Sequence, residues 1–396
     1  MRNFAWMLVA AGVVAASPPA SAQGVLNVYC SVQAEWCTLV ANEFQKATGV
    51  KVSITQKGSG ETIAQIKAEA QNPKGDVWFG GTGDPHLQAA EENLTEIYKS
   101  PKMSELQPWA VKQNTDSGGK TVGIYMGALG YGYNTELLAK KGVKPPACWA
   151  DLLKPEFKGE IQMANPNSSG TAYVAIATLV QLMGEEKAFD YLKKMHANVN
   201  AYTRSGTAPM KAVARGETGV SISFVHDGVT EALAGFPVKT ATPCEGTGYE
   251  IGSMSIIKGS RNLANAKKFY DWALTPEAQK LGAQAKQFQV PSNKATPLPP
   301  EAPKFADMKL IDYDQAKYGR SAERKRLIAR YHRRGRGLYA ITPRFAYGAS
   351  HELMKACEAL KREHPDCWVN THISENHDEI RGVLANAPDC ADYLAV

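Results

Sequence analysis

Hydrophobic and polar positions along the first part of the chain follow two alternating periods, one typical of strands and one typical of helices. Apolar runs or strict alternation predict five strands, at residues 25–29, 50–55, 76–79, 220–225 and 238–242. Apolar residues three or four positions apart predict seven helices, at residues 35–48, 62–71, 172–183, 185–196, 209–215, 263–274 and 277–285. This alternation predicts an α/β fold with a largely parallel sheet covered by helices.

The strand and helix rhythm occurs in two blocks, which predicts two lobes. We assign residues 23–126 and 246–330 to lobe 1 and residues 127–245 to lobe 2. Prolines 297, 299, 300 and 303 mark an extended surface segment. Two α/β lobes with polar loops at strand ends predict a ligand cleft between them, at the carboxyl ends of the strands.

The first 22 residues have the features of a secretory signal peptide. A charged start precedes a short apolar run and the small-residue sequence Ala20-Ser21-Ala22. The run is shorter than the roughly 18 to 20 apolar residues that span a bilayer, and no cysteine stands at the cleavage point. We therefore expect an exported protein of the periplasm.

Cysteine usage changes near Arg330. Four cysteines precede it, Cys30, Cys37, Cys148 and Cys244, and an oxidising periplasm allows them to pair in three ways. We favour Cys30–Cys37 with Cys148–Cys244, because the first two are close in sequence. The later cysteines, 357, 367 and 390, are odd in number, and none of the seven forms a CxxC spacing. The pattern predicts no metal site and no cofactor.

The net charge of +6 includes a basic run of eight arginines and lysines between Arg320 and Arg336. Such a run is compatible with nucleic acid or anionic lipid. We interpret it as a solvated helix face leading into a linker. We expect a monomer with no nucleic-acid partner.

Three loops place glycine and hydroxyl residues just before a predicted helix. Free backbone N–H groups at a helix start, together with serine or threonine hydroxyls, bind anions. Ordinary N-capping is the structural alternative for each loop. The candidate residues are Ser59, Gly60, Ser168, Ser169, Gly170, Thr171, Ser205, Gly206 and Thr207.

A second group of polar residues follows predicted strands and suits the hydroxyls of a polyol. His226 and Asp227 come directly after a strand, and Glu250 lies in a Gly-Tyr-Glu-Ile-Gly segment. Carboxylates accept hydrogen bonds, and a neutral histidine both donates and accepts. A satisfied structural His-Asp pair is the alternative.

Four segments, at residues 76–86, 163–173, 204–209 and 246–250, together resemble periplasmic solute-binding proteins of ABC importers over residues 25–330. The resemblance is to the branch that holds ferric-ion, thiamine, phosphonate and hexose-phosphate binders. It implies a type II periplasmic-binding fold, with two lobes joined by two crossovers, and an inner-membrane permease as partner. Ser31, Thr82 and Tyr125 complete the predicted ligand-binding set.

The choice of ligand follows from what the resemblance implies for each binder. Ferric binders share an adjacent tyrosine pair, and this chain contains no Tyr-Tyr. Thiamine needs aromatic faces around its cationic ring, and Trp78 and Tyr125 could supply them. The anion loops would then have no role unless the ligand is phosphorylated. Hexose-phosphate binders place a His-Asp pair and a glutamate against sugar hydroxyls, matching His226, Asp227 and Glu250. We therefore expect a small anionic solute, a sugar phosphate first and a phosphonate second.

The remainder, residues 331–396, changes character. Residues 338–346 and 369–376 resemble guanine deaminase of the amidohydrolase family. The resemblance implies a purine contact for Arg344, zinc binding for His372 and proton transfer for Glu375. A catalytic zinc takes three or more protein ligands, and the family's H-x-H pair and later histidine and aspartate are not found here. We interpret this segment as a truncated, partial β/α-barrel fragment and predict that the chain is not an enzyme.

Overall fold

The computed structural model describes residues 24–332, 340–341, 362 and 368–369. Its strands are β1 (Leu26–Cys30), β2 (Val52–Gln56), β3 (Val77–Phe79), β4 (Val122–Asn134), β5 (Ile161–Ala164), β6 (Val199–Thr203), β7 (Val220–Phe224), β8 (Val238–Ala241), β9 (Tyr249–Ile256), β10 (Val290–Pro291), β11 (Ala340–Ile341) and β12 (Trp368–Val369). The first helices are α1 (Ala34–Thr48), α2 (Ser59–Ala68), α3 (Gly83–Glu91), α4 (Pro108–Asp116), α5 (Thr135–Lys140), α6 (Gly170–Met183) and α7 (Glu185–His196). The later ones are α8 (Ala208–Ala214), α9 (Val225–Leu233), α10 (Leu263–Ala273), α11 (Pro276–Gln284), α12 (Gln315–Tyr318) and α13 (Ser321–His332). Short 3-10 turns cover Met103–Glu105, Trp149–Leu153, Pro155–Phe157 and Phe305–Asp307.

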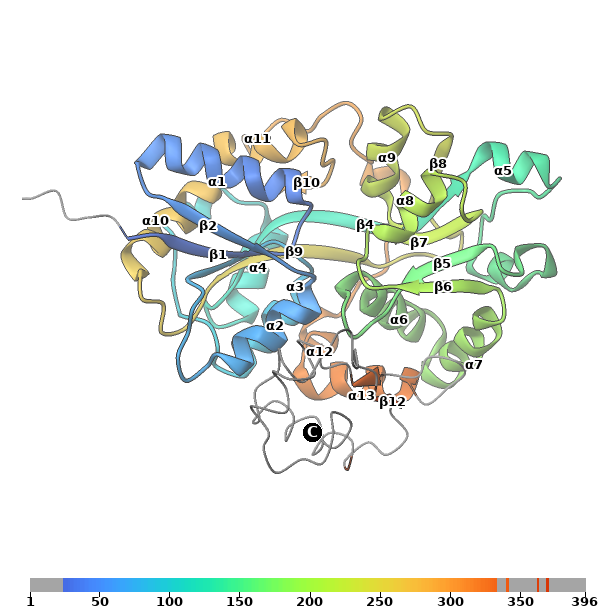
Figure 1. Cartoon of the computed structure of the whole chain (residues 1–396), viewed down its shortest axis with the longest axis horizontal. Coiled ribbons are helices and arrows are strands. Elements are labelled where there is room, and N and C mark those ends of the chain that lie inside the picture. Colours follow the sequence, from blue (N-terminus) through green and yellow to red (C-terminus); the bar gives the residue numbers. More distant parts are fainter. Residues whose placement is uncertain (1–23, 333–339, 342–361, 363–367, 370–396) are drawn as a thin grey trace, which may run out of the picture.

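Two α/β lobes lie side by side, and the long strands β4 and β9 run between them (Figure 1). The order of strands is β2-β1-β3-β9-β4-β7-β5-β6, with β8 and β10 also paired to β4. The first half of β4 pairs antiparallel with β9, and its second half pairs antiparallel with β7 and β8. This arrangement confirms the predicted α/β fold with two crossovers.

Each lobe has its own core. In lobe 1, Phe44, Phe269 and Leu26 are fully buried between the β1-β3 sheet and its helices. In lobe 2, Tyr131, Trp149 and Tyr173 occupy the corresponding place between β4, β5, β7 and helices α6 and α7. Burial of large apolar side chains on the two sides of a shared pair of strands stabilises two lobes rather than one body.

The strand β4 was not predicted. Glycine occurs at every second or third position of its second half, so the apolar alternation that marks a strand is interrupted. The structure shows the reason at Gly132, where an added Cβ would lie 2.0 Å from the sulfur of Met210 in α8. The lack of a side chain lets α8 pack directly on the strand. Helices α3, α4, α5 and α9 were also missed.

The end of the described region packs on both lobes. Tyr313, Tyr318 and Leu327 belong to the core cluster of lobe 2, although the sequence-based division placed them in lobe 1. The basic residues of α13 are only partly a solvated face. Arg326 and Arg330 pair with Glu185 at the start of α7, and Arg324 is 5% exposed.

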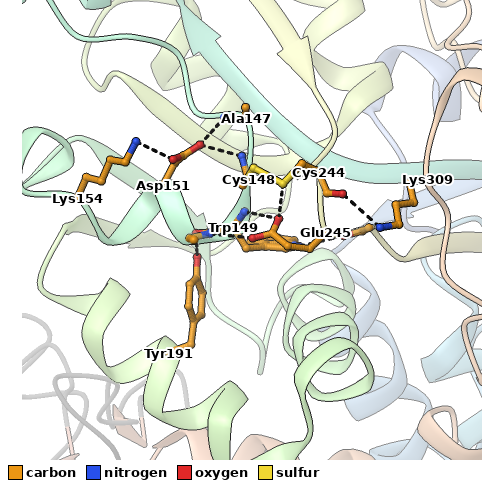
Figure 2. Close-up of a disulfide and its surroundings, with 11 residues drawn as sticks. Ala147, Cys148, Trp149, Asp151, Lys154, Tyr191, Cys244, Glu245 and Lys309 are labelled. Carbon is orange, nitrogen blue, oxygen red and sulfur yellow. Dashed lines mark hydrogen bonds and ion pairs between the residues drawn. A yellow bond between two sulfur atoms is a disulfide. The ribbon is translucent and has the colours of Figure 1, made fainter.

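Both favoured disulfides, Cys30–Cys37 and Cys148–Cys244, are present. Figure 2 shows the second, which ties the segment before Trp149 to the turn after β8. The Glu245 carboxylate next to it accepts hydrogen bonds from the backbone N–H groups of Trp149, at 2.8 Å, and Ala150, at 3.1 Å. The disulfide and this carboxylate together hold two distant loops of lobe 2 in place.

The predicted signal peptide lies outside the described residues, and so do Arg344, His372 and Glu375. Strands β11 and β12 pair in parallel. Among the helices that the structure describes, none combines the length and the apolar character needed to cross a membrane.

Candidate functional site

A cleft of about 380 Å³ lies between the lobes. Every predicted ligand-binding residue except Gly60 and Ser168 lines it: Ser31, Ser59, Thr82 and Tyr125 from lobe 1, and Ser169, Gly170, Thr171, Ser205, Gly206, Thr207, His226, Asp227 and Glu250 from lobe 2 and the crossover strand β9. The structure therefore brings together side chains from distant parts of the chain. Their role in binding remains a prediction.

The two exceptions have structural roles. An added Cβ on Gly60 would lie 2.2 Å from the carbonyl oxygen of Asn167, so the start of α2 touches the loop before α6 across the cleft. The Ser168 hydroxyl donates to the carbonyl of Arg204 at 2.7 Å and thereby joins two loops of lobe 2. Neither residue faces the cleft, yet both help to hold its walls.

Hydroxyl groups gather where three loops converge. Ser59 begins α2, Ser169 precedes α6, and the loop at 205–207 precedes α8. A Cβ on Gly206 would lie 2.2 Å from Thr171 Oγ1 and 2.8 Å from Ser169 Oγ, which measures how closely the last two loops approach. The N-cap residue of each helix makes no side-chain capping hydrogen bond. Neighbouring side chains do reach two of these helix starts: Glu61 accepts from the backbone N–H of Gly58 at 3.2 Å, and Ser205 Oγ accepts from the backbone N–H of Thr207 at 3.4 Å.

Some hydroxyls of the cleft are already engaged. Ser31 Oγ accepts a hydrogen bond from Trp78 Nε1 at 2.9 Å, and Tyr125 OH accepts one from the backbone N–H of Gly81 at 2.9 Å. Among the described residues, Thr82 Oγ1 is buried with no hydrogen-bond partner in the chain. This oxygen lies against the backbone of Gly170, where an added Cβ would be 1.8 Å from it.

A second group in the cleft consists of three ionisable side chains, each no more than 5% exposed. Nε2 of His226 lies 3.8 Å from Asp227 Oδ1 and 3.9 Å from Glu250 Oε1. His226 and Asp227 occupy the first turn of α9, directly after β7, whereas Glu250 is near the beginning of β9. The sequence analysis expected all three residues to follow strands. Glu250 instead lies inside a strand, as the second residue of β9.

Burial controls the charge of this cluster. It lowers the pKa of His226 to about 3 and raises the pKa of Asp227 to about 7. The pKa of Glu250 is raised well above its usual value, first by burial and then by the charges of Asp227 and Asp84. Near neutral pH the cluster therefore offers a neutral imidazole and acids that hold protons readily, which suits hydrogen bonding to uncharged hydroxyls.

Asp227 is also connected to the loop at 205–207 through the hydroxyl of Ser223. Ser223 Oγ lies 2.9 Å from the carbonyl oxygen of Gly206 and 2.9 Å from Asp227 Oδ2. A serine hydroxyl carries one hydrogen, so a protonated Asp227 donating to Ser223, which in turn donates to Gly206, satisfies both contacts. Burial, and not these hydrogen bonds, raises the pKa of Asp227.

Sequence reasoning missed several lining residues that connect the lobes. Gln33 Nε2 donates to Asp227 Oδ1 at 3.0 Å across the cleft. The guanidinium of Arg204 pairs with Glu61 of the opposite lobe. The other lining residues outside the predicted set are Val32, Gln56, Lys57, Gly58, Glu61, Gly81, Phe224 and Gln289. Arg204 stands beside the recognised 205–209 segment, but a single arginine in a loop has no distinguishing pattern, and Gln33 and Gln289 carry no sequence signal.

The comparisons with known proteins agree with this geometry. The model of the bacterial extracellular solute-binding protein family matches residues 76–318, and the chain belongs to this family. A Haemophilus influenzae protein without an assigned function is 47% identical over 326 residues, 82% of this chain and 94% of that protein. The solved structure of the periplasmic binding protein AfuA from Actinobacillus pleuropneumoniae, with fructose 6-phosphate bound, is 47% identical. It matches with a TM-score of 0.76 over 79% of this chain and 98% of AfuA.

The second resemblance is confirmed over a short stretch. Guanine deaminase from Escherichia coli is 49% identical over 87 residues, which is 22% of this chain and 19% of that enzyme. The sequence therefore joins a solute-binding protein to a piece similar to a deaminase. The larger part matches the family of bacterial extracellular solute-binding proteins and the periplasmic binding protein AfuA.

Proposed function

We propose that this protein is the periplasmic solute-binding component of an ABC importer and that its cleft binds a sugar phosphate. Its family membership and a relative whose structure contains fructose 6-phosphate support the proposal. The observation that carries it is the chemical contrast between two groups of residues that line the cleft. Helix starts with hydroxyls form one group, which we take as the phosphate end, and a buried His-Asp-Glu cluster forms the other, which we take as the sugar end.

The phosphate binds at the helix starts of α2 and α6. Both helices are long enough to carry a partial positive charge at their first turn, and Ser59, Ser169 and Thr171 add hydroxyl donors. The loop at 205–207 closes this end with further hydroxyls. Lys57 and Arg204 line the same cleft and contribute positive charge.

The sugar hydroxyls meet His226, Asp227 and Glu250. Because burial keeps the imidazole neutral and favours the protonated acids, these groups both donate and accept hydrogen bonds without a net charge facing the sugar. A free phosphate leaves this end unfilled, and a free hexose leaves the helix starts unfilled. A sugar phosphate occupies both ends.

A thermal-shift screen of the purified protein tests the proposal. We expect fructose 6-phosphate or glucose 6-phosphate to raise the melting temperature, and fructose, inorganic phosphate and ferric citrate to have little effect, because only a ligand that binds the folded state stabilises it. A shift with 2-aminoethylphosphonate or thiamine phosphate alone would identify another phosphorylated ligand. A shift with ferric citrate alone would contradict the anion-loop interpretation.

A matched pair of variants locates the phosphate. Ser169→Ala combined with Thr171→Val should weaken sugar-phosphate binding at least tenfold, because each lost hydrogen bond to a charged group costs about 1.5 to 3 kcal/mol. The matched control, Ser104→Ala combined with Thr115→Val at exposed positions outside the cleft lining, should bind as the natural protein does. Equal affinity in both variants would place the phosphate elsewhere.

A further inference from the structure

The two lobes meet backbone to backbone at the start of α2. Gly58 and Gly60 stand there, and both face the loop of lobe 2 that precedes α6. A Cβ added to Gly60 would lie 2.2 Å from the carbonyl oxygen of Asn167, and one added to Gly58 would lie 2.7 Å from that of Ser168. Ordinary contacts of a Cβ begin near 3.4 Å, so neither position has room for a side chain.

The local backbone does not itself require glycine at these positions. Gly58 has a φ of −63°, which other residues also adopt. Gly60 is a residue of helix α2 and does not have the positive φ that favours glycine. Alanine is the better helix former at such a position. The close approach of lobe 2, rather than the conformation of the chain, therefore leaves no room for a side chain.

The surface that receives α2 is held in place by its own hydrogen bonds. The carbonyl of Asn165 accepts from the backbone N–H of Ser168 at 3.2 Å, and its Oδ1 accepts from that of Asn167 at 2.9 Å. Ser168 Oγ donates to the carbonyl of Arg204 at 2.7 Å. A backbone carbonyl in such a turn does not swing aside as a flexible side chain would. A methyl group at Gly60 therefore has to move the lobes apart by about 1 Å, the difference between 2.2 Å and an ordinary contact.

Helix α6 shows the same relation in the opposite direction. Gly170, its first residue, faces Thr82 of lobe 1, whose Oγ1 would lie 1.8 Å from an added Cβ. The ion pair between Arg204 and Glu61 also joins the lobes here, but Arg204 is largely exposed and an exposed pair contributes little. Steric fit of the backbones therefore sets how closely the starts of α2 and α6 approach each other.

We propose that Gly60 is a positioning residue for the bound solute, because the absence of its side chain lets the start of α2 dock on residues 167–168 when the lobes close. Hinged lobes of this fold close around a ligand, and this contact is the place where they meet. Docking brings Ser59 of lobe 1 and Ser169 of lobe 2 to the same anion. A displacement of about 1 Å takes a hydrogen bond beyond its useful length, so the anion loses the donors of one lobe. The effect on binding, unlike the contact itself, rests on the proposed function.

Gly60→Ala tests the proposal with and without ligand. The lobes of the ligand-free variant are free to separate, so its melting temperature should equal or slightly exceed that of the natural protein, because alanine favours the helix. Its affinity for fructose 6-phosphate, measured by titration calorimetry, should fall at least tenfold, with faster dissociation of the ligand. Gly60→Leu places a larger group at the contact and should weaken binding further.

Ala64→Gly, the reverse exchange at an exposed position of the same helix, is the matched control. It should lower the melting temperature by a few degrees and leave the affinity unchanged. A lower melting temperature of ligand-free Gly60→Ala would show a permanent contact of the fold, and natural affinity in both Gly60 variants would show that the lobes do not meet there. Either result would overturn the proposal. If the natural protein does not bind fructose 6-phosphate, the proposed function fails, while the ligand-free melting temperature still decides whether the contact is permanent.

Discussion

At the scale of single residues, the cleft depends on side chains whose protonation burial has changed. Asp227 and Glu250 are acids placed where a charge is poorly solvated, and His226 is an imidazole in the same surroundings. Ionisable groups buried in this way lower the free energy of unfolding, and ligand sites commonly contain them. Asp227 provides the clearest test, because the structure shows its partners on both oxygens.

Asp227→Asn should stabilise the protein at alkaline pH. Because burial raises the pKa of Asp227 from 3.8 to about 7, the folded state holds a proton that the unfolded state releases between these values. The natural protein therefore loses stability as pH rises from about 4 to about 7, and asparagine does not titrate. We expect a gain in unfolding free energy on the order of 2 to 4 kcal/mol at pH 8 and almost none at pH 4. Urea unfolding at both pH values measures it, and a gain independent of pH would argue against a buried, protonated Asp227.

Asp227→Ala should instead weaken sugar-phosphate binding. The change leaves a ligand hydroxyl without its partner inside a closed cleft, which costs on the order of 1 to 3 kcal/mol, or about fivefold to 150-fold in affinity. Titration calorimetry with fructose 6-phosphate gives the number directly. Asp307→Ala, at an exposed position far along the chain, serves as control. Unchanged affinity in Asp227→Ala would remove this residue from the site.

At the scale of elements, α13 fastens the two lobes to each other. Arg324 Nη1 donates to Gln88 Oε1 of α3 at 2.9 Å, and its guanidinium lies 5.2 Å from the ring centre of Tyr173 in α6. The positive charge of Arg324 also lowers the pKa of buried Asp84, which burial as the larger effect raises to about 6. One side chain thus contacts an element of each lobe, and its charge acts on a buried acid.

Arg324→Met should destabilise the protein by about 3 kcal/mol, because the change leaves Gln88 Oε1 without its donor and buried Asp84 without a nearby positive charge. The loss should grow with rising pH, since Asp84 must then ionise in a buried place without a nearby positive charge. Thermal unfolding at pH 5 and pH 8 measures both effects. Arg320→Met, on the same chain segment but exposed, should change stability by less than about 0.5 kcal/mol. Equal effects of the two substitutions would show that Arg324 is not a clamp between the lobes.

Elements with a clear apolar period could be predicted, and those formed by glycine or by tertiary contact could not. Helix α1 was expected at residues 35–48 and found at Ala34–Thr48, because Trp36, Val40 and Phe44 mark one buried face. Strand β4 has too many glycines to show alternation, and α9 begins at Val225, inside what the sequence presented as a strand end. The cleft loops could be recognised from glycine and hydroxyl residues before helices. Gln33 and Arg204 contribute only through contacts across the lobes, which no local pattern encodes.

At the scale of the whole molecule, the chain joins two segments of different character. The cores, the cleft and the helix that joins the lobes are all formed within residues 24–332. The stretch similar to guanine deaminase equals 19% of that enzyme, and the resemblance implies zinc binding for His372 and proton transfer for Glu375. A catalytic zinc takes three protein ligands and an open position, so this stretch by itself does not provide the site.

Removal of the C-terminal segment should leave solute binding intact. A chain that stops after His332 keeps the whole of α13 and every residue that lines the cleft, so its affinity for fructose 6-phosphate should equal that of the full chain. Trypsin should produce a similar product by cutting among the arginines between Arg330 and Arg336, where seven residues contain four arginines. Calorimetry on the full and shortened chains, with mass spectrometry of the tryptic product, measures this.

In parallel, incubation of the full chain with guanine and zinc should release no ammonia, because one imidazole and one carboxylate are too few donors to hold a catalytic metal. Guanine turnover, or a shortened chain that folds but no longer binds sugar phosphate, would show that the C-terminal segment takes part in function.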